Sequence, residues 1–531
     1  MLKKYQQPVL CVTSGLLLWA SWPVSPFTFL IFIAFVPFLW MEVKSTSRLN
    51  FFGGAYLTML VWNIATTWWM CNSTVPGGVA AMLANSLLMC IPCLGFYNVK
   101  KSWGAPAGYT ALVLFWMTFE YIHLNWQLSW PWLTIGNVFA IHPNWVQWYE
   151  YTGTSGGTLW VLVVNILIFQ LVKRFHSFRT FGKKLSIITS LAVLVPFLFS
   201  MIVQPGLQED DIEPHNMVVV QPNINPYEKF SPGSQDSQLR ILIALSESKI
   251  DARSSIVIWP ETAINFQSGI EETRINGNPF FKPVWDFLQK HPQVKLVSGI
   301  EGYRLFTDQD KTASAKKIQD SEQYYDTYNT AGLLTGTGAI QLYHKSKLVP
   351  GVETLPSFLK FLDRWFEKFG GTTGGYASQK ERTVLVDPVS GYRMAPAICY
   401  ESIYGEFLTA YIRNGANVIV IITNDGWWAN TSGYRQHMQY ARLRAIETRR
   451  WIVRSANTGI SCFISSDGRV FNPQPWDVAA AIKMGIPKND YKTFYVIFGD
   501  ILSRSAAILT LLILLTTTFL WTRKHIRKYK K

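Results

Sequence analysis

Three side chains in the sequence could together carry out acyl transfer. Glu261, Lys345 and Cys399 each follow a short strand-like run, and open α/β folds hold ligands where such strands end. A thiol attacks a carbonyl carbon as its thiolate, so it needs a proton acceptor, which Glu261 can provide. The ammonium of Lys345 can stabilise the oxyanion that forms on the carbonyl oxygen. These residue types predict covalent catalysis through a cysteine thioester.

The segments around these residues predict a sheet buried on both faces. Continuous apolar, β-branched runs are typical of such strands. We expect a helix over 436–450 and two short strands around 457–459 and 466–468. An α/β sandwich with layered helices is therefore the predicted fold of this region. The predicted main strands begin near residues 217, 254, 294, 392 and 416.

The rest of the chain contains apolar stretches that could cross a membrane. Hydrophobic residues make up 49% of the 531 residues and gather towards both ends of the sequence. A spanning helix needs roughly 20 mostly apolar residues. The sequence predicts about eight spans, and the first is interpreted as an uncleaved anchor. They lie near 8 to 22, 26 to 43, 52 to 70, 79 to 97, 106 to 122, 157 to 172, 185 to 203 and 503 to 521.

The basic residues predict how these spans are oriented. The net charge is +15, and most of the excess lies in alternate loops and the C-terminal tail, whereas 71–78 and 123–156 contain no Lys or Arg. Because cytoplasmic loops are enriched in Lys and Arg, both termini are expected in the cytoplasm. We predict a membrane domain over 1–203, a periplasmic catalytic domain over 204–502, and a last span with a basic tail over 503–531. This distribution argues against binding to nucleic acid.

The six cysteines do not indicate a disulfide framework or a metal site. Cys90 and Cys93 share one CxxC-like spacing, but they lie in an apolar run and have no second pair. We interpret them as packing residues. No metal or other cofactor is predicted.

The motifs around the three reactive residues resemble those of a known enzyme family. The segments are WPETA at 259–263, YHK at 343–345 followed by LVP and Glu353, and ICYE at 398–401. They resemble the Glu-Lys-Cys signatures of the nitrilase superfamily, and within it the bacterial apolipoprotein N-acyltransferases. NDGW at 424–427, QH at 436–437, and PWL at 131–133 are similar to further motifs of that family.

The resemblance implies a function and a role for each residue. Glu261 would be the general base, Lys345 the oxyanion stabiliser and Cys399 the acylated nucleophile. The acyl donor would be a phospholipid, commonly phosphatidylethanolamine, and the acceptor the α-amine of a diacylglyceryl-cysteine at a lipoprotein N-terminus. The implied location is the bacterial inner membrane. Three further residues would support the catalytic set: Glu353, Tyr400 and Glu401.

Some features of this sequence depart from the family pattern or have two interpretations. Gly351 and Val352 precede Glu353 where the family usually has Phe-Gly, which affects loop shape and acyl-chain preference.

An acyl path could be lined by three aromatic residues, although aromatic residues also form interfacial belts in membrane proteins. His437 is interpreted as a structural helix residue, because Glu261 already serves as base. The three aromatic residues are Phe230, Trp427 and Trp428.

Two other functions use the same features of the sequence. A membrane-anchored amidase or nitrilase would use the same three residues with water as the second nucleophile. A transporter would need ionisable residues inside its spans, and Glu120 is the clearest such residue. Eight spans are unusual for an enzyme with a soluble substrate, which favours acyl transfer over hydrolysis.

Overall fold

The structure is a computed structural model that describes residues 2–203, 215–231, 233–266, 269–362 and 375–529. The chain forms two units. One contains Met1–Trp68, Gly78–Val203 and Phe498–Lys531, and the other contains Trp69–Gly77 and Gln204–Ile497. Residues 204–214, where the predicted catalytic domain begins, lie outside the described residues.

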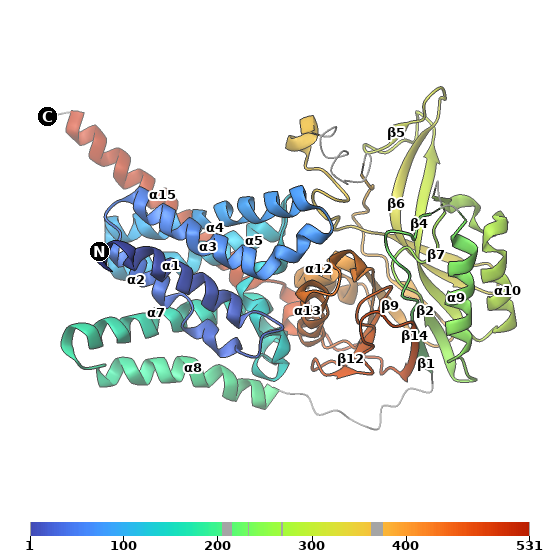
Figure 1. Ribbon diagram of the computed structural model, residues 1–531, viewed down its shortest axis with the longest axis horizontal. Coiled ribbons are helices and arrows are strands. Elements are labelled where there is room, and N and C mark those ends of the chain that lie inside the picture. The colour runs from blue at the N-terminus through green and yellow to red at the C-terminus, as the bar shows by residue number, and fades with distance from the viewer. Residues whose placement is uncertain (1, 204–214, 232, 267–268, 363–374, 530–531) are drawn as a thin grey trace. The chain divides into compact units, whose positions relative to one another are not determined.

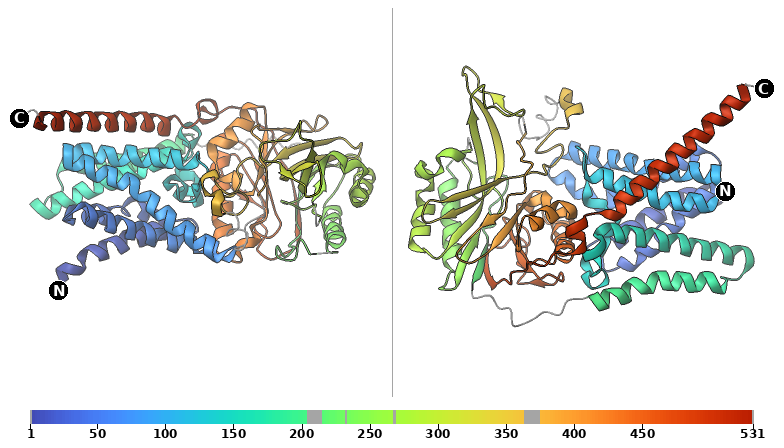
Figure 2. Two further views of the ribbon diagram at one scale, coloured as in Figure 1. Left: turned by 90° about the horizontal axis from the view of Figure 1, so that it is seen from above. Right: turned by 180° about the vertical axis from the view of Figure 1, so that it is seen from behind.

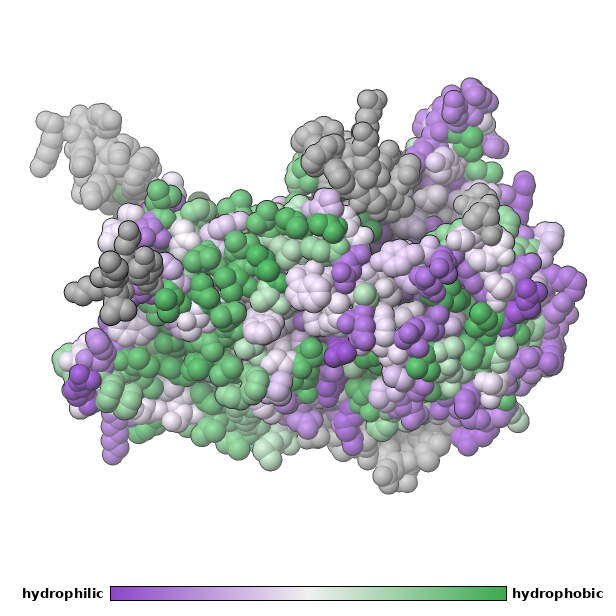
Figure 3. All heavy atoms as spheres, in the orientation of Figure 1, coloured by the Kyte–Doolittle hydropathy of each residue, from purple (hydrophilic) through white to green (hydrophobic). Residues whose placement is uncertain are grey.

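The first unit consists of helices with hydrophobic surfaces, as its visible face in Figure 3 shows. Among the described residues, α4, α7, α8 and the Ile501–Leu520 part of α15 are long and apolar enough to cross a membrane. The helices α1, α3 and α5 have 20 residues each and are not among these candidate spans. A count of eight spans therefore stays a prediction. The long helices are α1 (Leu2–Ser21), α3 (Arg48–Thr67), α4 (Val75–Trp103), α5 (Ala105–Leu124), α7 (Thr154–Phe178), α8 (Lys183–Val203) and α15 (Ile501–Tyr529).

The second predicted span, near 26 to 43, is not one helix. A 3-10 helix covers Thr28–Phe32, and α2 begins afterwards and covers Val36–Lys44. Pro37 lies in the first turn of α2. Proline has no N–H to donate and its ring clashes with the carbonyl four residues earlier, so a continuous helix through this position is disfavoured. The segment of this predicted span is therefore interrupted between Phe32 and Val36 rather than one continuous helix.

The connection between α5 and α7 is held by Glu120. Its carboxylate accepts hydrogen bonds from Trp116 Nε1 at 3.0 Å, Ile135 N at 2.8 Å and Thr158 Oγ1 at 2.8 Å. These bonds join the PWL loop to both helices, which gives this buried carboxyl a structural role. The connection contains the 3-10 helices Pro131–Leu133, Ile135–Ile141 and Pro143–Trp145 and the short α6 (Tyr149–Thr152).

The second unit contains two β-sheets. Among the described residues, the first has eight strands, with β14-β1-β2-β4-β6-β5 as its main order; β3 pairs with β4 and β7 with β6. The strands β1, β2 and β4 are parallel, whereas β6 runs antiparallel to β4. These strands are β1 (Asn216–Gln221), β2 (Ser254–Ile258), β3 (Ile270–Glu271), β4 (Lys295–Phe306), β5 (Lys316–Lys317), β6 (Tyr324–Thr335), β7 (Ile340–His344) and β14 (Ala480–Gly485).

The second sheet has six strands among the described residues, in the order β13-β12-β11-β10-β9-β8. Its centre, β9-β10-β11, is parallel. Two short strands were expected around 457–459 and 466–468, but these residues form the turns that flank β12, and the strands lie beside them in the chain. The strands are β8 (Leu385–Val386), β9 (Arg393–Ile398), β10 (Val418–Thr423), β11 (Ile452–Ala456), β12 (Cys462–Ile464) and β13 (Val470–Phe471).

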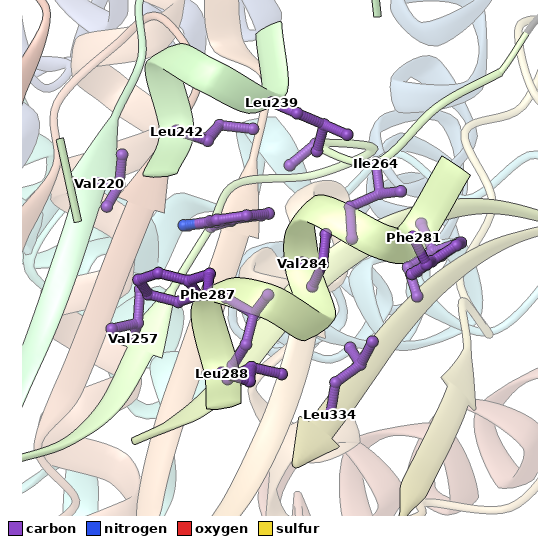
Figure 4. Packing of buried hydrophobic residues seen from close by; sticks show 14 of the residues in the cluster. Val220, Leu239, Leu242, Val257, Ile264, Phe281, Val284, Phe287, Leu288 and Leu334 are labelled. Carbon is purple, nitrogen blue, oxygen red and sulfur yellow. The ribbon is translucent and has the colours of Figure 1, made fainter. Parts of the chain in front are cut away.

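The two sheets face each other and carry helices on their outer faces. Ser455 Oγ on β11 donates to Val220 O on β1 at 2.8 Å. Helices α9 (Gln235–Glu247) and α10 (Lys282–Lys290) cover the first sheet (Figures 1 and 2). Figure 4 shows their buried side chains, including Leu242 and Phe287, packed against the strands. Helices α12 (Gly405–Arg413) and α13 (Ser432–Thr448) pack on the second sheet, and the short α14 (Phe494–Phe498) follows β14. The predicted α/β sandwich is confirmed.

Candidate active site

Glu261 lies directly after β2, in a loop held tightly against β4. Gly299 N donates to Pro260 O at 3.1 Å, and Ile264 N donates to Gly299 O at 3.0 Å. A Cβ atom at Gly299 would lie 2.3 Å from Thr262 N, so glycine is needed for this close approach. The loop therefore holds Glu261 at the carboxyl end of a parallel strand.

The carboxylate of Glu261 is buried, and both of its oxygens accept hydrogen bonds. Asn329 Nδ2 donates to Oε1 at 2.8 Å, and Lys345 Nζ lies 3.2 Å from the same oxygen. The backbone N–H of Asn424, which follows β10, donates to Oε2 at 3.0 Å. Glu261 thus receives hydrogen bonds from residues of both sheets.

Lys345 is held between two carboxylates. Its Nζ atom lies 3.2 Å from Glu261 Oε1 and 2.7 Å from Glu353 Oε1, and the lysine is 1% exposed. Burial lowers the pKa of Lys345, but the charges of Glu353 and Glu261 outweigh this effect, so the pKa is raised overall. Lys345 therefore stays a cation in the folded protein.

Glu353 is fixed by the loop that follows Lys345. Its Oε2 accepts from Val349 N at 2.8 Å, while Oε1 faces Lys345. Its own backbone N–H donates back to Val349 O at 2.9 Å. Glu353 and Lys345 are therefore held together within one short segment of the chain.

Cys399 follows β9 and has a left-handed backbone, with φ of 50°. This conformation is unfavourable for a residue other than glycine, so the surrounding contacts must hold it. Burial raises the pKa of the Cys399 thiol, the charge of Glu261 raises it further, and Lys345 acts in the opposite direction. The resting side chain is therefore a thiol. Glu261 and Lys345 are both close enough to influence its pKa electrostatically.

A buried network lies on the other side of Cys399. Its carbonyl oxygen accepts from Ser402 Oγ at 2.7 Å and faces His437 Nε2 at 3.2 Å. His437 Nδ1 lies 2.9 Å from Asp425 Oδ1, and Arg454 Nη2 donates to Asp425 Oδ2 at 2.5 Å. Although burial raises the pKa of Asp425, Arg454 and His437 outweigh it, so the pKa is lowered overall.

Glu401 connects the Cys399 segment to the Lys345 segment. Its Oε1 accepts from Tyr343 OH at 2.7 Å, Ser346 N at 2.6 Å and Lys347 N at 3.1 Å. Its Oε2 accepts from Ile398 N at 2.9 Å. Burial raises the pKa of Glu401, and these hydrogen bonds oppose that rise. The contacts give Glu401 a role in holding the two segments together.

The other predicted residues lie around this centre in different ways. Tyr400 is buried, and its ring packs edge-on against Tyr404 with centroids 5.3 Å apart. Phe230 is 40% exposed and belongs to the segment between β1 and α9. Trp427 packs against Tyr227 with ring centroids 5.4 Å apart.

The second tryptophan of the predicted acyl path is partly buried and packs against two buried rings. The ring centroid of Trp428 lies 4.8 Å from that of Trp69 and 5.5 Å from that of His437. Asn72 Nδ2 donates to Trp428 O at 3.0 Å. The segment Trp69–Gly77 is therefore packed against the loop that follows β10.

Sequence reasoning missed two polar residues of the site. Asn329 lies in β6 and donates to Glu261, and Lys229 Nζ donates to Glu261 O at 2.7 Å and Thr262 Oγ1 at 2.8 Å. A polar residue inside an apolar strand, as in YNTAGLL at 328–334, was the available signal for Asn329. Among the residues that the structure describes, no three His, Cys, Asp or Glu side chains are grouped as metal ligands.

Known proteins are similar to both units of this chain. Residues 219–491 match the carbon-nitrogen hydrolase family, and residues 14–167 match the apolipoprotein N-acyltransferase N-terminal domain. The apolipoprotein N-acyltransferase of Chlorobaculum tepidum is 31% identical over 506 residues, which cover 92% of each chain. This chain belongs to the apolipoprotein N-acyltransferase family. It is therefore a member of an enzyme family that combines a helical unit with a nitrilase-like unit.

Other apolipoprotein N-acyltransferases and one amidase are similar to this chain to a lesser degree. The protein of Geobacter metallireducens is 26% identical over 508 residues, covering 93% of this chain and 92% of that protein. An amidase structure from Nesterenkonia sp. is 14% identical, with a TM-score of 0.34, and covers 52% of this chain and 92% of the amidase.

Proposed function

We propose that this chain transfers a fatty acyl group from a phospholipid, commonly phosphatidylethanolamine, to the α-amine of an N-terminal diacylglyceryl-cysteine in lipoproteins. The observation that carries the proposal is the buried contact of Lys345 with Glu261 and Glu353, within electrostatic reach of Cys399, in a chain of this family. Acyl transfer through a thioester needs a base, a fixed cation and a thiol, and this set supplies them.

In the first half-reaction, Glu261 removes the proton from the Cys399 thiol as sulfur attacks the ester carbonyl carbon of the phospholipid. A sulfur–carbon bond forms, and Lys345 stabilises the negative oxygen of the tetrahedral intermediate. The ester carbon–oxygen bond then breaks, and Glu261 returns the proton to the leaving lysophospholipid oxygen. Because the resting thiol is protonated, the nucleophile is generated when the donor is bound.

In the second half-reaction, the acceptor amine attacks the thioester carbonyl carbon. A carbon–nitrogen bond forms, the carbon–sulfur bond breaks, and the released proton returns to sulfur through Glu261. Glu353 holds Lys345 in place, Glu401 joins the segments of Lys345 and Cys399, and Tyr400 is the buried residue that follows the nucleophile. The contacts of Glu353 and Glu401 support the roles proposed for them.

The acyl chain needs an apolar path to the site, and three aromatic residues are suited to line it. Phe230 is exposed, and Trp427 and Trp428 lie in the loop that follows β10, close to the backbone N–H that binds Glu261. Their apolar faces would cover a lipid chain, whereas the site itself binds the polar ester.

For the location, we propose eight spans in a bacterial inner membrane, with both termini cytoplasmic and residues 204–502 periplasmic. Residues 1–203 would be the membrane domain, and 503–531 the last span and its basic tail. The support is the alternation of Lys- and Arg-rich loops with loops that lack them.

Hydrolysis of a small amide is the second candidate, because the matched carbon-nitrogen hydrolase family carries this chemistry in its name. The two functions differ in the second nucleophile, an amine or water. Purified protein should be incubated with acyl-labelled phosphatidylethanolamine and a diacylated lipopeptide. Acyl transfer predicts labelled amide on the peptide, whereas free fatty acid formed equally with and without peptide would favour the hydrolase.

A further inference from the structure

Glu301 and Asn329 lie directly opposite each other on β4 and β6. Opposed residues of an antiparallel pair project from the same face of a sheet, with Cβ atoms roughly 5 Å apart. Asn329 Nδ2 donates to Glu261 Oε1 at 2.8 Å and lies 3.4 Å from Glu353 Oε1. Glu301 is therefore on the face of the sheet that carries the proposed active site.

Each of these two residues has a buried oxygen atom without a hydrogen-bond donor among the described residues. The atoms are Glu301 Oε2 and Asn329 Oδ1. Glu301 Oε1 is satisfied by Tyr376 OH at 2.7 Å, and Asn329 is 2% exposed. A buried acceptor without a donor is destabilising, so two such atoms on one face indicate a site for a donor group.

The charges around these atoms favour an additional cation. Three carboxyl groups, those of Glu261, Glu353 and Glu301, act on one another here, while Lys345 and Lys229 supply two positive charges. The Nζ atom of Lys229 donates to the Glu261 carbonyl and to Thr262, and not to Glu301 Oε2. When all three carboxyls are ionised, one further positive charge balances the cluster.

We propose that Glu301 Oε2 and Asn329 Oδ1 bind the primary ammonium group of the acyl acceptor, an inference that rests on the acyl transfer proposed above. A primary ammonium has three N–H donors and no acceptor, which matches two oxygens that lack donors. Asn329 also contacts Glu261, so the bound nitrogen would lie beside the general base.

The site also gives the ammonium proton a destination. Burial raises the pKa of Glu301 to about 7, close to the range in which an α-amine titrates. The ammonium loses one proton to Glu301 and becomes the free amine, which attacks the thioester carbonyl carbon. A second proton passes through Glu261 to the sulfur of Cys399 as the carbon–sulfur bond breaks. The amide keeps the third hydrogen, and Glu301 later releases its proton to water.

The Glu301→Gln variant tests this site because the amide keeps the oxygen that Tyr376 binds and loses the charge and the base. With phosphatidylethanolamine vesicles as donor, we expect transfer to a diacylated lipopeptide at pH 7 to fall about 10- to 100-fold. The rate of Cys399 acylation should fall far less. At pH 9 the peptide amine is already neutral, so the difference between the two proteins should narrow.

Two controls separate an ammonium site from a general structural defect. Hydroxylamine is neutral at pH 7, and its reaction with the acylated cysteine should be the same in both proteins. Glu271→Gln changes a half-buried glutamate on β3 that pairs with Arg274, and it should transfer like the unmodified protein. Equal transfer to lipopeptide by Glu301→Gln and unmodified protein would overturn the ammonium site alone. Absence of any acyl adduct on the unmodified protein would overturn the proposed function and this inference together.

Discussion

His437 Nε2 lies 3.2 Å from the carbonyl oxygen of Cys399, and His437 Nδ1 lies 2.9 Å from Asp425 Oδ1. The histidine thus connects the backbone of the proposed nucleophile to the buried Asp425–Arg454 ion pair. Cys399 has an unfavourable left-handed φ, so its orientation depends on such contacts. We infer that His437 positions the Cys399 backbone, which is consistent with its interpretation as a structural helix residue rather than a catalytic one.

The effect of a His437 substitution on the acylation rate of Cys399 should depend on which ring nitrogen the new side chain replaces. Glutamine places its amide nitrogen near Nε2, and asparagine places it near Nδ1. Because Nε2 reaches Cys399, His437→Gln should keep more of the acylation rate than His437→Asn, which should lose about 10- to 100-fold. The measurement is the rate of acyl-adduct formation on Cys399.

The stability of both His437 variants serves as the control for this prediction. Thermal unfolding in detergent should show similar losses for glutamine and asparagine, because both replace a buried ring by a smaller amide. Equal acylation rates for the two variants would contradict a positioning role through Nε2.

Removing the charge of Lys345 should destabilise the second unit strongly. Lys345→Met leaves Glu261 and Glu353 buried without their shared cation, and breaking a buried pair on one side costs about 3–5 kcal/mol. Lys282→Met is the matched control, because Lys282 pairs with Asp286 on the surface and should contribute less than about 1 kcal/mol. Denaturant unfolding of the two variants measures the difference, and equal losses would contradict the buried contact.

Glu301 should make the free energy of unfolding depend on pH. Burial raises its pKa from 4.5 to about 7 in the folded protein. The folded state therefore holds a proton that the unfolded chain has lost, and stability falls as the pH rises from about 4.5 through 7. Glu301→Gln removes this loss and should be more stable than the unmodified protein at pH 8, by up to about 3 kcal/mol. A stability difference that is the same at pH 5 and pH 8 would argue against the raised pKa.

The sequence predicted the strands near the site well because continuous apolar runs have few alternatives. The runs beginning near 217 and 254 became β1 and β2, and both lie in the buried sheet. The order and context of the sequence motifs also pointed to Glu261 and Lys345. In the structure, Lys345 Nζ lies 3.2 Å from Glu261 Oε1. The sequence did not reveal that the segment near 26 to 43 is interrupted, because an apolar composition does not show where one helix ends and the next begins.

The sequence did not indicate that Glu301 and Asn329 are neighbours. They are brought together only by the register of β4 and β6, which the sequence does not reveal. The two residues are far apart in the chain, and no local pattern tells which residue of one strand faces which residue of the other. The contact of His437 with Cys399 was missed for the same reason, since α13 and the end of β9 meet only in the folded unit.

In the proposed reaction, Cys399 carries the acyl group between the two substrates. Intact mass spectrometry after incubation with phosphatidylethanolamine alone should show one added fatty-acyl mass on the unmodified protein and none on Cys399→Ala. Addition of a diacylated lipopeptide should remove this mass from the protein and place it on the peptide amine. An adduct of equal size on Cys399→Ala, or acylated peptide made by that variant, would show that the acyl group does not pass through Cys399.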